Sequence, residues 1–314
     1  MAYTNTDTNM TTSSALSAGM QTYYNRELLR TFEPNLVHLQ FGDEHRMPPH
    51  SGLVMNMRKL IPLETNTKAL SEGDPGESVM LAETEVTVQL QQYGEYARCT
   101  DKLDLTHLDM DIMRRTKLFG DAGARSIDAV VREELAKCAN VIYAGGKASR
   151  AELTAADKLT SRELRKAVKT LKKNHAQTFG GYFVAIIGPD TMYDLQEDEA
   201  FVKVSQYQDK ENIYTGEVGR LFGVRLVETT EAKIFEGAGT DGADVASVIV
   251  LGQYAYGVTS LKGAKPRVIV KPAGSAGTAD PLDQISTVGW KMDGFGAKLL
   301  QQEYAVRIEC GFSA

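Results

Sequence analysis

The feature that most restricts how this chain can fold is a pair of strand-like segments separated by turn-forming residues. Residues 53–61 (LVMNMRKLI) and 79–98 both read as β-strands, and in the second Val86, Val88 and Leu90 alternate with polar residues. Residues 72–78 (EGDPGES) break any regular element, so the two segments predict a long hairpin. A two-stranded ribbon has no core of its own and two open edges. We therefore expect something to cover it, most economically a neighbouring copy of the chain.

The residues before the hairpin predict an arm and a short helix. Residues 1–14 are polar and low in complexity, which is typical of an arm that gains order only from a partner. A helix is expected between Ser17, which can cap it, and Pro34, which ends it. Residues 41–49 are expected to be irregular because Pro48 and Pro49 stand together.

The strongest helical pattern of the chain runs from about Met110 to about Ala144. Thr106 and Asp109 have the spacing of a capping box at its start, and Gly145 follows its end. Its apolar residues recur on one face: Ile112, Phe119, Ile127, Val130, Val131, Leu135, Cys138 and Ile142. This length predicts a scaffold element that spans the molecule.

The second half of the chain predicts a mixed α/β region. A helix that Thr160 opens carries Leu164, Val168 and Leu171 inward, and its outward face is basic: Arg162, Arg165, Lys166, Lys169, Lys172 and Lys173. The apolar run 182–188 (YFVAIIG) predicts a buried central strand, with a short helix around 192–195. Further strands are expected at residues 224–229, 245–251 and 268–271 and at the end of 297–310.

Composition excludes several classes of protein. The 314 residues carry 35 Lys+Arg against 41 Asp+Glu, a formal net charge of −6, so the chain lacks the basic footprint of a general nucleic-acid binder. No apolar run is long enough for a membrane span, and we expect the chain to stay in the cytoplasm. Cys99, Cys138 and Cys310 are odd in number and widely spaced, which predicts reduced thiols.

Short motifs that could carry chemistry have simpler explanations. Residues 237–242 (GAGTDG) have the spacing of a dinucleotide-binding loop, but a strand-like pattern follows where a helix is required, so we expect a surface loop. Gly145-Gly146-Lys147 is followed by Ala148 in place of the Ser or Thr of a phosphate-binding loop, and a helix stop explains it better.

The titratable residues likewise form no recognisable site. The histidines lack the spacing of metal ligands: His38, His45, His50, His107 and His175. Helix amphipathicity explains the acidic pairs Asp109/Asp111 and Glu133/Glu134. The basic helix face could touch nucleic acid, but such a face is more often solvated or meets an acidic neighbour. We therefore predict no catalytic, cofactor-binding or metal-binding residue, no cofactor and no enzymatic activity.

The order of several short stretches carries a family resemblance. They are residues 33–42 (EPNLVHLQFG), 92–96 (QYGEY) with 103–106 (LDLT), 181–190 (GYFVAIIGPD), 216–225 (GEVGRLFGVR) with 227–230 (VETT), 256–258 (YGV), 280–282 (DPL) and 287–291 (TVGWK). In order and spacing the chain resembles the major capsid proteins of tailed bacteriophages with the Hong Kong 97-like fold, and it is most similar to the N4-type proteins.

The resemblance implies an α+β capsid fold with interleaved parts. These are an N-terminal arm (1–50), an extended β-hairpin loop (51–100), a peripheral domain (101–185) with a spine helix at about 107–144, an axial domain (186–270) and a return to the peripheral domain (271–314). It gives no residue a catalytic, cofactor-binding or metal-binding role.

The implied function is structural. A major capsid protein of this family assembles as hexamers and pentamers into the icosahedral shell of the virion, in the host bacterial cytoplasm, and encloses double-stranded DNA without reading its sequence. Scaffolding, portal and decoration proteins are possible partners, and no membrane is involved. Two alternatives stay open: the shell of a cellular nanocompartment with the same fold, and a nucleotide-binding enzyme that uses the loop at residues 237–242.

Overall fold

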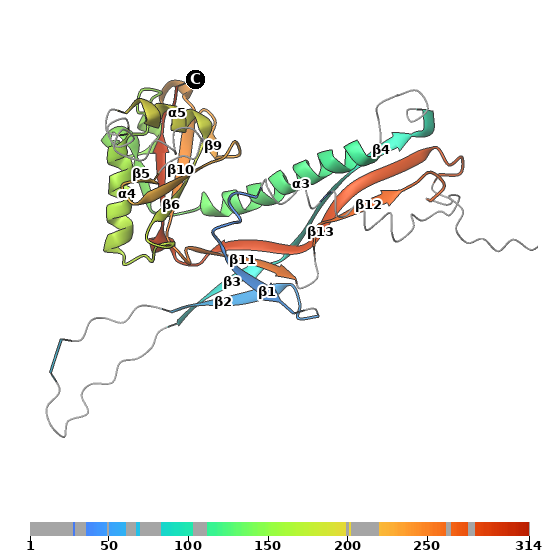
Figure 1. The fold of residues 1–314 in the computed structure, drawn as a ribbon, viewed down its shortest axis with the longest axis horizontal. Helices are drawn as coiled ribbons and strands as arrows, with labels where there is room; N and C mark the ends of the chain where they lie inside the picture. Colours follow the sequence, from blue (N-terminus) through green and yellow to red (C-terminus); the bar gives the residue numbers. More distant parts are fainter. Residues whose placement is uncertain are drawn as a thin grey trace, which may run out of the picture.

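A computed structural model describes Leu28 and residues 36–48, 50–60, 67–69, 83–102, 112–198, 201, 220–261, 265–275 and 280–313. Figure 1 shows a lobe at one end and a long helix that leaves the lobe beside an extended sheet. A hairpin lies on the side of that sheet opposite the helix. Within the described residues the architecture is mixed α+β, with three sheets. No helix of the described residues is long and apolar enough to cross a membrane.

The lobe is built on a seven-stranded sheet with the order β5-β14-β10-β6-β8-β7, and β9 pairs with β10 at one side. These strands are β5 (Val141–Tyr143), β6 (Phe183–Ile187), β7 (Arg220–Leu221), β8 (Val224–Glu228), β9 (Ile234–Phe235), β10 (Val245–Leu251) and β14 (Ala305–Cys310). Strands β6, β10 and β14 are buried along their whole length, which confirms the central strand predicted from the run YFVAIIG.

Two helices help to form the core of the lobe. Helix α4 (Ser161–Lys173) buries Leu164, Val168 and Leu171, as the sequence predicts, and its lysines and arginines point outward. Helix α5 (Pro189–Glu197) adds Met192 and Leu195 to the same hydrophobic cluster. The chain in and around the lobe also forms short 3₁₀ turns: η2 (Ala144–Gly146), η3 (Arg150–Glu152), η4 (Thr240–Gly242) and η6 (Gln302–Tyr304).

The long helix and the second sheet form the extended part of the molecule. The sheet has the order β1-β11-β13-β12, and β4 also pairs with β13. Its strands are β1 (Asp43–Met47), β4 (Gln91–Thr100), β11 (Tyr256–Leu261), β12 (Arg267–Lys271) and β13 (Ile285–Leu299). Helix α3 (Ile112–Leu135) runs along β13, and Ile127 and Val131 join Trp290 and Phe295 in a second hydrophobic cluster.

The predicted hairpin is confirmed in its central part. Strand β2 (Val54–Leu60) pairs antiparallel with β3 (Glu83–Gln89), and the two form a sheet of their own. The second predicted segment does not stay in the hairpin, however. It is interrupted at Leu90, and the residues after it form β4, which pairs with β13. The pattern of alternation could not show this change of partner because both strands have the same period.

Two other predictions about elements are wrong. Helix α3 ends at Leu135, not near Ala144, because Val141–Tyr143 pairs in parallel with β14 and Arg307 donates to the carbonyl of Ala136 just after the helix end. Residues 43–47 are not irregular but form β1, parallel to β11. Leu28 is helical and buried, and the rest of the first predicted helix lies outside the described residues, as does the predicted start of α3 at residues 106–109.

Candidate assembly surfaces

The base of the β2–β3 hairpin packs on the body of the same chain. Met57 and Val88 are buried, and glycines opposite them make the room. A Cβ at Gly257 would lie 2.7 Å from the Met57 sulfur, and one at Gly296 would lie 2.9 Å from a Val88 methyl. The base of the hairpin is therefore covered by its own chain, whereas the sequence led us to expect a neighbouring copy to cover the whole hairpin.

The rest of the hairpin remains open. Among the described residues β2 and β3 pair only with each other, so each has an unpaired outer edge. Val54 is 53% exposed, and the neighbouring Leu53 is 56% exposed. Lys59 anchors the hairpin through an ion pair with Glu303 at 2.7 Å. Unpaired backbone edges beside exposed apolar side chains are a surface on which another chain can add.

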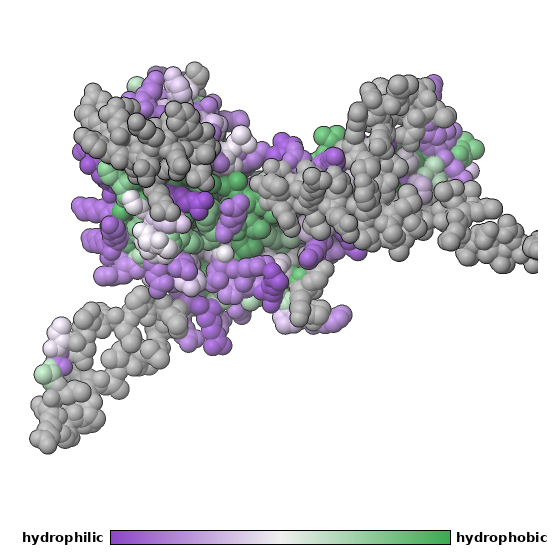
Figure 2. All heavy atoms as spheres, in the orientation of Figure 1, coloured by the Kyte–Doolittle hydropathy of each residue, from purple (hydrophilic) through white to green (hydrophobic). Residues whose placement is uncertain are grey.

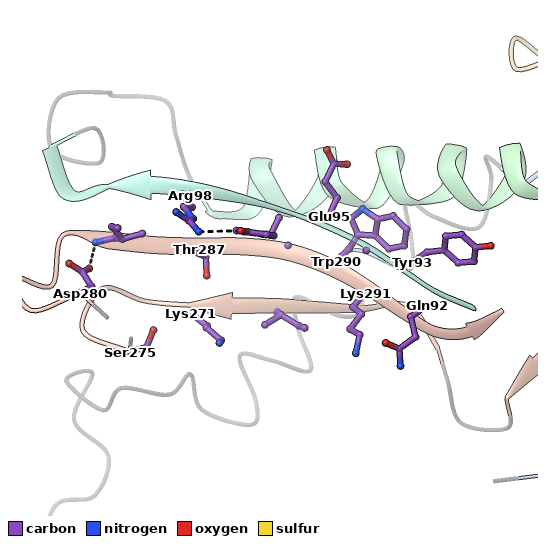
Figure 3. A pocket seen from close by; sticks show the side chains of 15 residues that line it. Gln92, Tyr93, Glu95, Arg98, Lys271, Ser275, Asp280, Thr287, Trp290 and Lys291 are labelled. Carbon is purple, nitrogen blue, oxygen red and sulfur yellow. Dashed lines mark hydrogen bonds between the residues drawn. The ribbon is translucent and has the colours of Figure 1, made fainter. Parts of the chain in front are cut away.

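A second open surface lies on β4, β13 and β12, where Figure 3 shows Lys271, Thr287 and Lys291 pointing away from helix α3. It holds a cavity of about 630 Å³. Strand pairing puts Tyr96, Gly289 and Ile269 in one row across the three strands. Gly289 is required there because a Cβ would lie 2.5 Å from the Glu95 carbonyl oxygen. Tyr96 is 61% exposed, so this sheet face presents an aromatic ring framed by cations.

The segment before β1, residues 36–42, forms a plug between helix α3 and β11. His38 and Asp128 are both buried. The Asp128 carboxylate accepts a hydrogen bond from the His38 backbone N–H at 2.7 Å and is hydrogen-bonded to His38 Nδ1 at 2.6 Å. The Tyr256 hydroxyl donates to the His38 carbonyl, and burial raises the pKa of Tyr256. A Cβ at Gly42 would lie 2.7 Å from the Tyr256 ring. These contacts tie residues 36–42 to helix α3 and strand β11.

Sequence reasoning missed this pair. The sequence marks His38 only as a potential metal ligand, and it gives Asp128 no motif. A signal was present, because Asp128 lies one turn from Ala124 on the face of α3 that also carries Val131 and Leu135. A carboxylate in such an apolar stripe is informative, since it must find a partner when it is buried.

The motif residues do not form a site. Residues 237–242 form a surface loop followed by β10, as predicted, and the Asp244 carboxylate accepts a hydrogen bond from the Gly237 amide at 2.7 Å. Gly145 and Gly146 lie in η2, away from the end of α3. His45 pairs with Asp43 at 3.1 Å, and His107 lies outside the described residues. No three metal-ligating side chains gather within the described residues.

The acidic and thiol side chains have structural partners. Burial alone would raise the pKa of Glu133, but hydrogen bonds from Lys233 and Arg132 hold that pKa below its usual value. Glu134 pairs with Lys137 and with Lys298. The pair Asp109/Asp111 lies outside the described residues. The three cysteines are free and buried, which confirms the prediction of reduced thiols, and burial raises the pKa of Cys138 and Cys310.

The sequence matches a known protein family. A model of the protein family described as "Phage capsid protein" matches residues 83–308. The chain belongs to this family. Its role is therefore that of a structural protein of a phage capsid. A comparison with curated proteins finds no match.

Solved structures share the fold of this capsid protein. The capsid of Ralstonia phage GP4 matches with a TM-score of 0.69 at 14% identity, covering 100% of this chain and 98% of that one. The capsid of cyanophage P-SCSP1u gives 0.66 at 15% identity, covering 88% and 89%. A virus-like particle from Pyrococcus furiosus gives 0.53 at 12% identity, covering 92% and 99%. At such identities the likeness is one of fold.

Proposed function

We propose that this protein is a major capsid protein of the N4 type with a Hong Kong 97-like fold, and that its copies assemble as hexamers and pentamers into an icosahedral shell around double-stranded DNA. Family membership and the likeness in fold to phage capsids along the whole chain support this. In this proposal residues 1–50 are the arm, 51–100 the extended loop, 101–185 and 271–314 the peripheral domain, and 186–270 the axial domain. The shell forms in the host cytoplasm, with scaffolding, portal and decoration proteins as possible partners.

The observation that carries the proposal is the projecting hairpin. It is anchored at its base by Met57, Val88 and the Lys59–Glu303 ion pair, yet within the described residues both of its outer edges are unpaired. A free subunit gains nothing from such a ribbon, whereas in a shell each ribbon can pair with a neighbour. Each copy can then bury modest area against several others, so that the shell is stable while the subunit stays separable.

Electron microscopy of the expressed protein tests the proposal. We expect shells or capsomer rings from the full chain, and a soluble subunit without shells when residues 66–78 are deleted. The unfolding temperature of the deleted subunit should stay close to that of the dissociated full chain, because the deletion spares the anchoring residues. A compact monodisperse monomer from the full chain would overturn the proposal.

The net charge of −6 suits a container for DNA. An acidic subunit does not displace the counterions of duplex DNA, so the genome can move during packaging. We expect the purified subunit to bind duplex DNA weakly at physiological salt. Tight, salt-sensitive binding in a filter or gel-shift assay would contradict this part of the proposal.

A cellular nanocompartment shell is the second candidate, because the Pyrococcus furiosus particle also matches in fold. Co-purification of a cargo protein from the native host, with no DNA inside the particles, would favour it. The nucleotide-binding enzyme has less support, because residues 237–242 precede strand β10 and not a helix. A shift of the unfolding temperature by a nucleotide would support the enzyme.

A further inference from the structure

Helix α4 carries a one-signed charged face along one flank of the lobe (Figure 1), where Figure 2 shows mainly hydrophilic side chains. We call this face the cationic flank; it consists of Arg162, Arg165, Lys166, Lys169, Lys172 and Lys173. The helix has a single carboxylate, Glu163, which is buried and lies 3.7 Å from Lys166. Arg162, Lys169, Lys172 and Lys173 have no ion pair with any described residue.

Such a helix face is unfavourable in an isolated subunit. Lys169 lies three or four residues from four other cations of the flank, namely Arg165, Lys166, Lys172 and Lys173. Like charges at these spacings destabilise a helix by about 0.2–0.5 kcal/mol per pair. The chain as a whole is acidic, so the grouping does not reflect its composition. An anionic partner would remove this repulsion.

The same lobe carries a complementary surface around β9. Residues 228–244, which we call the acidic flank, hold five carboxylates and one lysine: Glu228, Glu231, Glu236, Asp241, Asp244 and Lys233. The lysine is engaged by Glu133 at 2.8 Å, and Arg132 lies 3.7 Å from Glu231. The other four carboxylates have no cationic partner among the described residues, and all four are exposed.

The acidic flank is preorganised. The Thr240 amide donates to the Leu153 carbonyl at 2.8 Å, and its hydroxyl donates to the Ala151 carbonyl at 2.8 Å. Gly239 donates to Ala243 at 2.9 Å. These bonds hold the loop in one shape, so a partner would pay little ordering entropy there.

The two flanks lie on different sides of the lobe, since in Figure 1 helix α4 and strand β9 lie at opposite sides of it. We infer that the cationic flank of one copy docks on the acidic flank of the next copy. A contact between two different patches repeats head to tail, and it forms a ring when the rotation between successive copies closes, as the capsomers of the proposed function require. The inference rests on the proposed function and specifies its partner: the lobe of a second copy of this chain.

Charge reversal tests the inference. The double variant Lys169→Glu/Lys172→Glu and the double variant Glu228→Lys/Glu236→Lys should each raise the protein concentration needed for assembly by about tenfold or more. The four changes together should bring it back to within about twofold of the wild-type value, because the complementary pairs are restored with opposite sign. Light scattering and electron microscopy measure assembly, and the unfolding temperature of each dissociated variant controls for folding.

The neutral variant Lys169→Gln/Lys172→Gln is a matched control and should give an intermediate loss. Shells of the wild type combined with unchanged assembly of either reversed double variant would overturn the inference and leave the proposed function standing. Loss in both doubles without rescue in the combined variant would also overturn it and would point to a different anion on α4, such as packaged DNA. Absence of any wild-type particle would overturn both.

Discussion

Removing the imidazole of His38 should destabilise the subunit far more than a surface histidine does. Asp128 is fully buried in helix α3, and among the described residues its carboxylate is hydrogen-bonded to His38 alone, through the backbone N–H and through Nδ1. In His38→Ala the backbone N–H can still donate, but the second carboxylate oxygen is left buried without a partner. The contact between residues 36–42 and helix α3 is then weaker.

The expected magnitude follows from burial. Leaving a buried polar group without its hydrogen-bond partner costs about 1–3 kcal/mol, and more for a carboxylate that stays charged. The matched control is His45→Ala on strand β1, since His45 also pairs with an aspartate, Asp43, at 3.1 Å. Both side chains of that pair are about one-third exposed, so its loss should cost at most about 1 kcal/mol.

Urea unfolding of the dissociated subunit measures both values. The only tryptophan, Trp290, is buried in the same hydrophobic cluster as α3, so its fluorescence reports on this part of the fold. A double-mutant cycle with Asp128→Ala should give a coupling energy of about 1–3 kcal/mol between the two side chains. A coupling near zero, or equal losses in His38→Ala and His45→Ala, would refute the reasoning.

Three further outcomes follow from single contacts. Gly289→Val should lower stability by about 1–3 kcal/mol in the same urea assay, because its Cβ would lie 2.5 Å from the Glu95 carbonyl oxygen. Burial alone would raise the pKa of Asp194, but hydrogen bonds from Ser313 and Lys158 lower it below the ordinary value of 3.8. The stability that this carboxylate contributes is therefore present above pH 3.8 and lost as the pH falls through the lower folded value, so the difference in unfolding temperature between wild type and Asp194→Asn should shrink there. The three buried thiols should react with a thiol reagent only after urea unfolds the subunit, and fast labelling of the native protein would contradict their burial.

Elements whose type is set by neighbouring residues in the sequence could be predicted. Helix α4 is recognisable because Leu164, Val168 and Leu171 recur at helical spacing. Strand β6 is recognisable because its uninterrupted apolar run has the length of a strand and a glycine and a proline follow it. The hairpin pairing of β2 and β3 was also predictable from alternation and from the turn residues between them.

Elements that depend on distant partners escaped prediction. Strand β13 contains Gly289, Gly294 and Gly296, residues that weaken a strand by themselves. They fit because other strands approach closely: a Cβ at Gly296 would lie 2.9 Å from Val88. Likewise, helix α3 stops early because residues 141–143 pair with β14. No window of sequence contains both partners of such contacts.

The candidate surfaces likewise include some that the sequence predicts and some that only the fold reveals. The outward cations of α4 follow directly from helical periodicity, and the sequence predicts that such a face is solvated or meets an acidic neighbour. The pair His38–Asp128 joins residues ninety positions apart, and only the apolar face around Asp128 hinted at it. The acidic flank is spread over β8, β9 and η4, so it becomes one surface only when β9 pairs with β10.

The sorting of charge within the lobe also bears on the symmetry of assembly. In a two-fold contact each patch can meet its own copy, and the cationic flank would then face six like charges at short range. The acidic flank has the same difficulty, with four carboxylates that have no cationic partner among the described residues. A head-to-tail contact instead brings every cationic flank against an acidic one. The separation of cations and carboxylates onto two flanks therefore disfavours two-fold pairing through these flanks and favours rings. The net charge of −6 does not reveal this separation.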